Sequence, residues 1–371
     1  MKLTARKKIL MTGGHAATTA IAVIQEIKGT KSLKGVQIYF VGSRFAMEGL
    51  DIETLEHRTL PKIGVNFYPI VSGRLQTKFT RYTLVSLLKI PVGFLHAFYI
   101  LLKIKPDLVL TFGGFASFPI VFWSFIFGTP VILQEQTIAA GRATIFSSVF
   151  VRRILLARSE SIKYFPKEKC IVTGNPVMKE ILDIERNTKK HSPINILFMG
   201  GSRGSSFINR LVMSLVPKLA TNYRVTHIAG EKDFSELIKF KSVLPKNIAG
   251  KYKLVATVEP FEMAKYYKGC DLIIARAGAN TVSEILYLKK PVIFIPLALS
   301  FADEQMKNAK SVEQFGIARV VSEKEATPEK LMTEISSVLG DYESIVRKVA
   351  GKSSPDVDAS KKIVSILKEY I

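Results

Sequence analysis

Asp271-Leu272-Ile273-Ile274-Ala275-Arg276-Ala277-Gly278-Ala279-Asn280-Thr281-Val282-Ser283-Glu284 decides the fold of this 371-residue chain. An apolar run, which predicts a buried strand, passes through a turn containing Gly278 into a helical pattern that starts near Asn280. A helix N-terminus directs free backbone N–H groups and the positive end of the helix dipole toward an anion. Glu284 lies one turn into the helix, where its carboxylate can reach ribose hydroxyls. Taken alone, the stretch equally fits an ordinary strand–helix turn of any α/β protein.

A second stretch of the same kind favours a ligand. Residues 194–199 form another apolar run, followed by Gly200-Gly201-Ser202-Arg203-Gly204 and by a helical pattern with apolar positions 207, 211, 215 and 219. Glycines let the backbone approach a phosphate closely, and successive N–H groups form an anion-binding nest. Two such loops in one half of the chain favour a diphosphate-containing ligand. Two further glycine pairs, Gly13-Gly14 and Gly113-Gly114, follow apolar runs in the other half.

Apolar runs alternate with helical patterns along the whole chain, which predicts an α/β fold with doubly wound parallel sheets. The alternation is interrupted once, by the polar segment Asp183–Pro193. We therefore expect two Rossmann-type domains that face each other across a cleft, with the glycine loops at the carboxyl ends of the strands. The expected parts are an N-terminal domain, a linker, a C-terminal domain and a terminal amphipathic helix that packs back toward the N-terminal domain. Their boundaries are 1–176, 177–193, 194–354 and 355–371.

Composition narrows the class of protein. Lys and Arg number 53 against 31 Asp and Glu, which gives a net charge of +22 and favours polyanionic partners such as anionic lipid, phosphorylated substrates or nucleic acid. No nucleic-acid-binding motif accompanies the charge, and its even spread also fits a generally basic proteome. The 2 cysteines exclude a disulfide framework and a CxxC metal pattern, so we expect a cytoplasmic protein. The basic N-terminus leads into a glycine turn, so no signal peptide is expected.

Two long apolar stretches, Tyr82–Leu102 and Phe118–Leu133, have two interpretations. The first is broken by Lys89 and Pro91 and the second is too short, so neither predicts a transmembrane helix. They are either two core helices or a surface patch that enters a membrane. The basic segment 74–81 next to the first stretch favours the patch, because anionic headgroups attract it. The expected patch residues are Arg74, Lys78, Phe79, Arg81, Leu87, Leu88, Trp123 and Phe125.

From residue 8 to about residue 321 the chain resembles the MurG family of UDP-N-acetylglucosamine transferases. The sharpest matches are Gly200–Gly204, with Asn209 after it, and Arg276–Glu284. Asp303-Glu304-Gln305-Met306-Lys307-Asn308-Ala309 is the next sharpest match. Weaker ones are Gly174-Asn175-Pro176-Val177, Gly113-Gly114-Phe115 and Glu135-Gln136. The resemblance implies the metal-independent GT-B glycosyltransferase fold.

The resemblance also implies roles at a donor site. Glu284 is expected to hold the uridine ribose, and Gln305 the hydroxyls of N-acetylglucosamine. Gly201, Ser202 and Gly204 are expected to cradle the diphosphate. The remaining donor contacts are Ala279, Asn280 and Thr281. No metal site and no cofactor is expected, because UDP-N-acetylglucosamine is a substrate.

On the acceptor side, the resemblance implies that His15 acts on the attacking hydroxyl. Histidine suits general-base chemistry near neutral pH, although His15 could equally only position a phosphate. The other expected acceptor or diphosphate contacts are Gly13, Gly14, Gly113, Gly114, Glu135, Gln136, Thr137 and Lys179. This side departs from the family pattern. The glycine run before His15 is short, Gln134-Glu135-Gln136-Thr137 replaces His-Glu-Gln-Asn, and Met178 replaces an arginine that Lys179 could substitute.

The function that the resemblance implies is inverting transfer of N-acetylglucosamine to the muramyl sugar of a polyprenyl-diphosphate-linked peptide, which converts lipid I to lipid II in peptidoglycan synthesis. The expected place is the cytoplasmic face of the membrane, as a peripheral enzyme with no nucleic-acid partner. Two alternatives remain open. One is a UDP-N-acetylglucosamine 2-epimerase, which shares the two-domain fold. The other is a degenerate transferase that binds nucleotide or lipid without turnover, for which the short loop at His15 is the best support.

Overall fold

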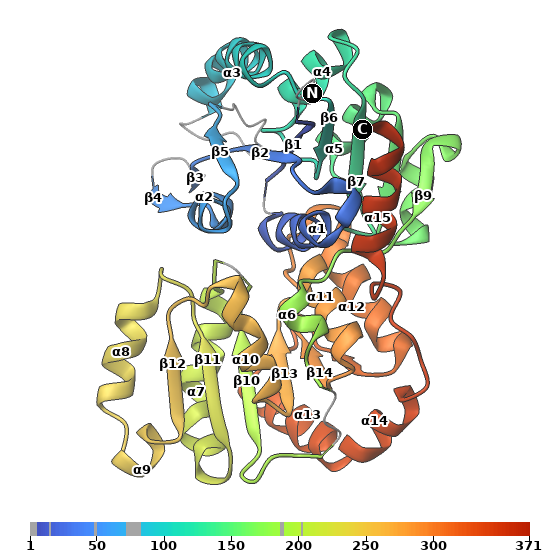
Figure 1. Cartoon of the computed structure of the whole chain (residues 1–371). Helices are drawn as coiled ribbons and strands as arrows, with labels where there is room; N and C mark the ends of the chain where they lie inside the picture. The colour runs from blue at the N-terminus through green and yellow to red at the C-terminus, as the bar shows by residue number, and fades with distance from the viewer. Residues whose placement is uncertain (1–5, 15, 48–49, 72–82, 186–188, 202) are drawn as a thin grey trace. The chain divides into compact units, whose positions relative to one another are not determined.

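The computed structural model describes residues 6–14, 16–47, 50–71, 83–185, 189–201 and 203–371 (Figure 1). For residues 46, 47, 50–52 and 83–88 it describes the backbone only. The chain forms two compact units, residues 1–178 together with 355–371, and residues 179–354. Most of the segment that the sequence suggested as a linker therefore lies in the second unit.

The first unit is built on a seven-stranded sheet with the order β5-β2-β1-β6-β7-β8-β9, in which each pairing is parallel. Runs of three to six residues form these strands, and the inner ones are apolar because both faces of the sheet are covered by helices. The strands are β1 (Lys8–Thr12), β2 (Gln37–Gly42), β5 (Asn66–Pro69), β6 (Leu108–Thr111), β7 (Val131–Glu135), β8 (Arg153–Leu156) and β9 (Cys170–Val172). The main helices are α1 (Ala17–Gly29), α2 (Leu55–Thr59), α3 (Thr83–Ile104), α4 (Phe118–Ile126), α5 (Arg142–Ser147) and α15 (Ala359–Leu367).

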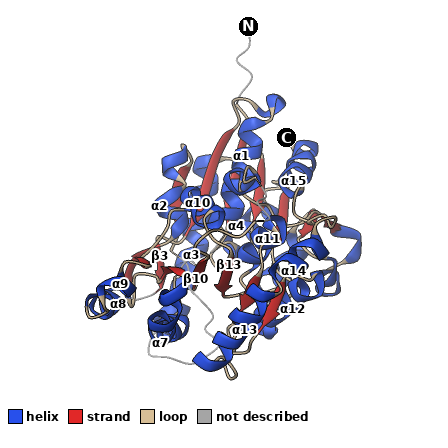
Figure 2. Cartoon of the chain, turned by 90° about the horizontal axis from the view of Figure 1, so that it is seen from below, coloured by secondary structure: helices blue, strands red, loops and turns tan. Residues whose placement is uncertain are grey.

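The second unit is built on a six-stranded parallel sheet with the order β12-β11-β10-β13-β14-β15. Its strands are β10 (Asn195–Met199), β11 (Arg224–Ile228), β12 (Tyr252–Val255), β13 (Leu272–Ala275), β14 (Val292–Phe294) and β15 (Ala318–Val320). The helices are α6 (Lys179–Leu182), α7 (Ser206–Asn222), α8 (Phe234–Ser242), α9 (Lys246–Ala249), α10 (Met263–Lys268), α11 (Ala279–Leu288), α12 (Glu304–Phe315), α13 (Pro328–Gly340) and α14 (Tyr342–Val349). Figure 2 shows helices flanking the strands of both units.

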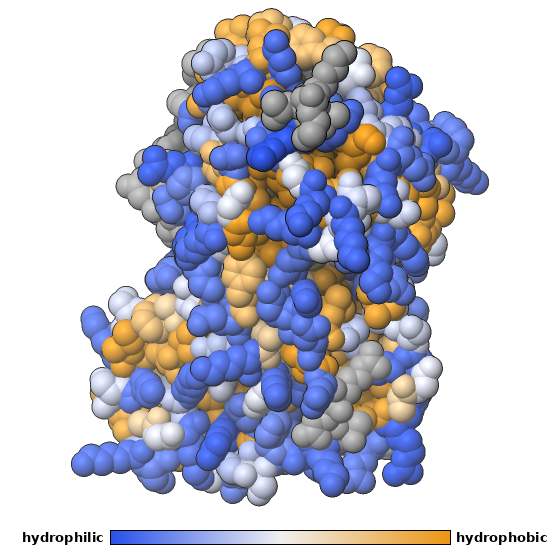
Figure 3. Space-filling view, in the orientation of Figure 1, coloured by the Kyte–Doolittle hydropathy of each residue, from blue (hydrophilic) through white to orange (hydrophobic). Residues whose placement is uncertain are grey.

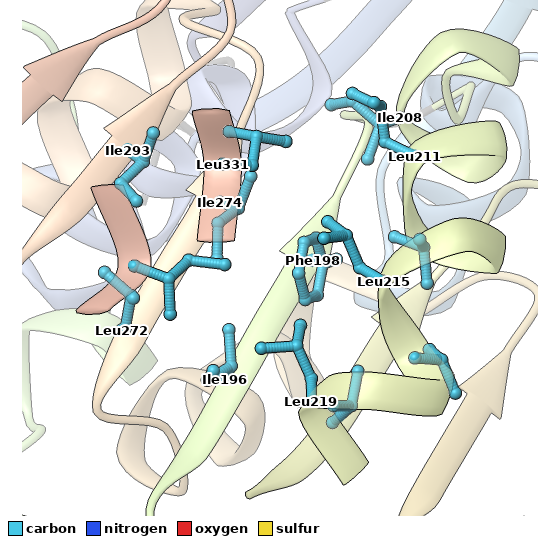
Figure 4. Close-up of a cluster of buried hydrophobic side chains, with 14 of the residues drawn as sticks. Ile196, Phe198, Ile208, Leu211, Leu215, Leu219, Leu272, Ile274, Ile293 and Leu331 are labelled. Carbon is cyan, nitrogen blue, oxygen red and sulfur yellow. The ribbon is translucent and has the colours of Figure 1, made fainter. Parts of the chain in front are cut away.

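The core of the second unit follows from the period of α7. Leu211, Leu215 and Leu219 recur every four residues, so they share one face of the helix, and each is buried. Figure 4 shows this face packed against Phe198 of β10. The sheet and the helix are thereby fixed to each other directly below the loop that joins them.

The C-terminal segment belongs to the first unit, where α15 packs on α1. Arg158 holds it with two hydrogen bonds, of 2.6 and 2.7 Å, to the buried carboxylate of Asp356. Asp356 also accepts a hydrogen bond from the Asn175 amide at 2.7 Å. The α-helix ends at Leu367 and a 3-10 turn follows, so the helix is shorter than the segment 355–371 expected from its pattern.

One element was not predicted. An antiparallel pair, β3 (Phe45–Met47) and β4 (Leu50–Glu53), lies outside the main sheet of the first unit. Its strands have three and four residues, too few for an alternating pattern to stand out in the sequence.

Candidate functional site

The two glycine loops of the second unit lie side by side. β10 and β13 are neighbours at the point where the strand order of the sheet reverses, and Met199 pairs with Ala275 at their carboxyl ends. Ligands of doubly wound sheets bind at this reversal point. Each loop leads directly into a helix, α7 after the first and α11 after the second, so two helix N-termini start beside each other. The arrangement suits an anionic ligand with more than one phosphate.

The first loop has a backbone that only glycine adopts easily. Gly201 and Gly204 have positive φ angles of 83° and 75°. A Cβ atom on Gly204 would lie 2.1 Å from the Ala229 carbonyl oxygen, and one on Gly200 would lie 2.3 Å from the Ser205 amide nitrogen. The loop is therefore folded tightly against its own helix and against the loop after β11. Ser202, which we expect at the diphosphate, lies outside the described residues.

Arg276 joins the two loops, a role that the sequence did not reveal although the residue stands inside the sharpest motif. Its guanidinium is 8% exposed and donates to the Ser205 hydroxyl from Nε at 3.2 Å and from Nη2 at 3.0 Å. Ser205 is the N-cap of α7 and accepts from the Ile208 amide. Arg276 also donates to the Ile295 carbonyl at 2.9 Å and pairs with Glu323. One buried cation thus connects the ends of β10, β13, β14 and β15.

The second loop carries the expected donor contacts. Gly278 is the N-cap of α11 and offers no side-chain cap, and Ala279, Asn280 and Thr281, half-buried, form the first turn. The first amides of a helix have no partner within the helix. Glu284 is 9% exposed and lies one turn later. Helix side chains lean toward the N-terminus of the helix, which directs the Glu284 side chain toward this first turn.

Glu284 has one hydrogen-bond partner that the sequence did not indicate. The hydroxyl of Tyr267, on α10, donates to Glu284 Oε2 at 2.7 Å and has no exposed surface. Burial raises the pKa of Glu284 to about 7, and the hydrogen bond from Tyr267 opposes that rise. The carboxyl group is therefore partly protonated near neutral pH when no ligand is present.

A buried polar network supports the first loop from below. Asn209 on α7 donates to the Ala229 carbonyl at 3.1 Å and to Asp233 at 2.8 Å. Its carboxamide oxygen is 2.9 Å from Nε2 of His227, whose Nδ1 is 2.9 Å from the Tyr252 hydroxyl. Burial lowers the pKa of His227 to about 3, so this histidine is neutral and structural. The motif residue Asn209 therefore positions the loop through contacts inside the domain.

The third motif of this unit begins with a strained turn. Ala302 and Asp303 have positive φ angles of 50° and 54° just before α12. Gln305, the expected sugar contact, is half-buried, and its carboxamide oxygen accepts from the Leu297 amide at 3.0 Å. Because the oxygen is occupied, the amide nitrogen is the end of this side chain that can donate to a sugar hydroxyl. Asn308 donates to the Ala277 carbonyl at 3.2 Å and so ties α12 to the second loop.

The glycine pairs of the first unit are arranged in the same way. β1 and β6 are neighbours at the reversal point of the sheet, and Thr12 pairs with Thr111. The loops after them are in close contact. A Cβ atom on Gly13 would lie 2.8 Å from Cβ of Phe112, and one on Gly114 would lie 3.5 Å from the Gly14 amide nitrogen. Gly113 has a φ of 76°, and a Cβ atom there would lie 2.5 Å from the Thr144 hydroxyl. The structure thus brings Gly13, Gly14, Gly113 and Gly114 together.

His15, the expected base, lies outside the described residues. The next residue, Ala16, is the N-cap of α1, and its amide donates to Glu56 Oε1 at 2.7 Å. Glu56 is 3% exposed on α2, and sequence analysis gave it no role. A carboxylate at the start of α1 stabilises the positive end of the helix dipole and fixes the chain just after His15.

The remaining acceptor-side residues are held by their neighbours. Glu135 is buried, and its Oε1 accepts from both the amide and the hydroxyl of Thr137, each at 3.0 Å. The Gln136 carboxamide accepts from Thr19 of α1 at 3.2 Å, which connects the loop after β7 to α1. Lys179 is exposed at the start of α6 and belongs to the second unit, and Met178 before it is buried in the first.

The expected membrane patch is only partly described. Arg74, Lys78, Phe79 and Arg81 lie outside the described residues, and the side chains of Leu87 and Leu88 are not described. Trp123 is half-buried and donates to the Phe94 carbonyl at 2.9 Å, whereas Phe125 is 52% exposed. Within the described residues, no helix is both long and apolar enough to cross a membrane. Nor do three or more of their His, Cys, Asp or Glu side chains come together as a metal site.

Both halves of the chain match domains of one glycosyltransferase family. The glycosyltransferase family 28 N-terminal domain matches residues 12–156, and the family 28 C-terminal domain matches residues 195–363. A curated relative from Clostridium kluyveri is 31% identical over 98% of this chain and 99% of its own length. Its name is UDP-N-acetylglucosamine–N-acetylmuramyl-(pentapeptide) pyrophosphoryl-undecaprenol N-acetylglucosamine transferase.

Solved structures agree on the fold. The crystal structure of MurG from Acinetobacter baumannii is 23% identical, with a TM-score of 0.68, over 98% of this chain and 99% of that one. A UDP-N-acetylglucosamine 2-epimerase from Neisseria meningitidis, bound to UDP-N-acetylglucosamine, has a TM-score of 0.67 at 15% identity over 98% of this chain and 100% of that one. The fold alone does not separate the two kinds of enzyme, whereas the 31% identity over the full chain is to a transferase.

Proposed function

The chain belongs to the MurG family within glycosyltransferase family 28, and from that membership we propose that it transfers N-acetylglucosamine from UDP-N-acetylglucosamine to a lipid-linked muramyl peptide. The observation that carries the proposal is the pair of glycine loops side by side at the reversal point of the second sheet, in a chain that aligns with the transferase relative over 98% of its length. The direct test is an assay with labelled UDP-N-acetylglucosamine and lipid I.

In this proposal the second unit holds the donor. The glycine loop after β10 and the first turn of α11 offer backbone amides to the diphosphate, Glu284 accepts hydrogen bonds from the ribose, and Gln305 donates to the sugar. The acceptor oxygen attacks the anomeric carbon, and the bond from that carbon to the UDP oxygen breaks. UDP leaves with the electron pair, and its growing charge is stabilised by the amides. His15 takes the proton of the attacking hydroxyl.

The epimerase is the second candidate, because its fold matches this chain equally well. Epimerisation acts on the nucleotide sugar alone and needs no contact with a bilayer. The apolar face of the first unit, described next, therefore favours the transferase. Labelled UDP-N-acetylglucosamine separates the candidates, because a transferase yields labelled lipid, an epimerase yields the free epimer, and a binding protein yields neither.

We also propose that the enzyme acts at the membrane surface, where a polyprenyl-linked acceptor resides. α3 exposes Val92, Leu95, Tyr99 and Leu102, which are spaced along one face of the helix and are 47–70% exposed. Aromatic contacts join this face to α4, since the Phe98 ring meets Trp123 edge-on and Phe127 at a tilt. The apolar face continues over Phe125, Ile126, Phe127, Phe146 and Val149. Figure 3 shows hydrophobic surface on the part of the first unit where Figure 1 places α3 and α4.

Neighbouring exposed apolar side chains of this kind are typical of an interaction site, and the net charge of +22 suits an anionic surface. We expect the protein to sediment more with anionic vesicles than with neutral ones, and salt to weaken the binding without abolishing it. Reversing the charges of Arg74, Lys78 and Arg81 together should weaken vesicle binding, since each basic residue contributes about 1 kcal/mol on anionic lipid. Replacing both Leu95 and Tyr99 by Ser should remove the salt-resistant part.

The matched control is Val243→Ser, which changes a 78% exposed apolar residue of the second unit. Vesicle binding of this control should equal that of the wild type, and UDP binding should be unchanged in every variant. If the charge-reversed and Ser variants partition like the wild type, the face on α3 and α4 is not the membrane contact.

We further propose that turnover needs no metal ion. Two helix N-termini and a glycine nest can stabilise the charge of the leaving diphosphate by themselves. Activity should therefore persist in excess EDTA at the rate measured with added Mg²⁺. Activity that disappears in EDTA and returns with Mg²⁺ would show that a cation shares this task.

A further inference from the structure

Tyr267 has a contact that no motif of the sequence suggested. It lies near the end of α10, a six-residue helix, and its ring and hydroxyl have no exposed surface. Its hydroxyl donates to Glu284 Oε2 at 2.7 Å, although the residues are 17 positions apart and come from different helices. Among the described residues, it is the only hydrogen-bond donor recorded for this carboxylate. The Tyr267 hydroxyl thus connects α10 to the Glu284 carboxylate of α11.

A phenol hydroxyl that donates to a carboxylate has two effects. It fixes the rotation of the carboxylate plane, which leaves Oε1 as the oxygen for another donor. It also favours the ionised form, because the hydrogen bond is stronger to a charged acceptor. Both effects matter for a group that is 9% exposed, since burial alone disfavours its charge.

We propose that Tyr267 is a positioning residue for the donor nucleotide: its hydroxyl orients the Glu284 carboxylate and keeps it ionised, so that the free oxygen accepts from the ribose. The inference rests on the proposed function, because it takes Glu284 as the ribose contact. Ribose hydroxyls donate well to a carboxylate, whereas a neutral carboxylic acid is a poorer acceptor.

The charged surroundings support this assignment. Burial raises the pKa of Glu284 to about 7, and the Tyr267 hydrogen bond is the influence that lowers it. Burial, with smaller contributions from Glu284 and Cys270, raises the pKa of Tyr267 well above its usual value, so its hydroxyl remains a neutral donor. The helices that pack around α11, and α10 itself, carry other ionisable groups, namely Lys179, Glu180, Lys265, Tyr266, Lys268, Glu304, Lys307, Lys310 and Glu313. None of these shifts the pKa of Glu284.

The ionisation of Glu284 should make UDP affinity depend on pH. Donor binding needs the ionised carboxylate, so UDP affinity should rise with pH through about 7 and level off above it. Without the phenol hydroxyl the pKa should rise further, by about one unit. The midpoint of the affinity curve should then move to higher pH.

The test is calorimetry of UDP binding to the full-length protein across about pH 6 to 9, for the wild type and Tyr267→Phe. The variant should bind UDP about five- to tenfold more weakly at pH 7, with its midpoint about one pH unit higher. Above the new midpoint, affinity should largely recover. Tyr342→Phe is the matched control, because Tyr342 is equally buried in the same unit but its ring lies against Lys190, and among the described residues it makes no hydrogen bond to Glu284 or to the network below the first loop. Its midpoint should equal that of the wild type.

A double variant separates positioning from general damage. Glu284→Gln should flatten the pH profile, and adding Tyr267→Phe to it should cause little further loss, because the group on which Tyr267 acts is gone. The inference is overturned if Tyr267→Phe keeps the wild-type profile. It is also overturned if that variant loses affinity uniformly at every pH, as a merely structural residue would. If the wild type binds UDP with this profile but transfers no sugar to lipid I, the proposed function fails while the inference stands. If the wild type does not bind UDP, both fail.

Discussion

His15→Ala should lower turnover by about 10²–10⁴-fold while UDP affinity stays close to that of the wild type. The attacking hydroxyl has a pKa far above neutral, so it must lose its proton as the new bond forms, and an imidazole can accept that proton near pH 7. UDP binding should be spared, because the nucleotide contacts that we propose all come from the second unit. Steady-state transfer rates and calorimetry with UDP measure the two quantities separately.

His15→Gln is the informative companion variant. Glutamine retains a hydrogen-bond donor that can hold a phosphate, but it cannot take up a proton at neutral pH. If His15 is the base, turnover should therefore fall by the same factor in the Ala and Gln variants. If the Gln variant turns over at nearly the wild-type rate, His15 only positions the acceptor. The hydrogen bond from Ala16 to buried Glu56 is the contact that holds the chain beside this position.

Glu284→Ala should weaken UDP binding by about ten- to a hundredfold. A charge-assisted hydrogen bond is worth about 1.5–3 kcal/mol, and each 1.4 kcal/mol is a factor of ten in the dissociation constant. The structure adds a reason for a large effect, because the substitution also leaves the buried Tyr267 hydroxyl without its acceptor.

The control for this variant is Glu304→Ala. Burial raises the pKa of Glu304 to about 7, as it does for Glu284, so the two carboxyl groups are electrostatically alike. Glu304 stands next to Gln305, the expected contact to N-acetylglucosamine, and UDP lacks that group, so the affinity of Glu304→Ala for UDP should equal that of the wild type. Unchanged UDP affinity in Glu284→Ala would refute the ribose assignment.

The sequence predicted the strands well because both sheets are parallel and their inner strands are buried, which makes those strands continuous apolar runs. It also predicted that the glycine loops lie at the carboxyl ends of β1, β6, β10 and β13, since strand–helix alternation places them there. The antiparallel pair β3–β4 was missed because three or four residues carry too little pattern.

The supporting contacts of the site could not be predicted, because they join distant parts of the chain. Arg276 and Ser205 are 71 positions apart, and Ala16 and Glu56 are 40 apart. Arginine in a glycine-rich turn is ordinarily a solvated side chain, and only the packing of four strand ends buries this one. Tyr267 likewise resembles any core tyrosine until its hydroxyl is seen on Glu284.

The departures from the family pattern concentrate on the acceptor side, at the short glycine run before His15, at Thr137 and at Met178. The Thr137 hydroxyl lies within hydrogen-bond distance of the Glu135 carboxylate and the Ala139 carbonyl. Met178 is buried in the first unit. These substitutions fit local packing in the described residues.

The most direct experiment follows the label from UDP-N-acetylglucosamine to lipid I in anionic vesicles, with purified protein and EDTA present. We expect labelled sugar in a β linkage in the lipid fraction and release of an equal amount of UDP. His15→Ala should abolish most of the signal. Free N-acetylmannosamine or its UDP form in the aqueous fraction, or tight UDP binding with no labelled lipid, would contradict the proposed transfer.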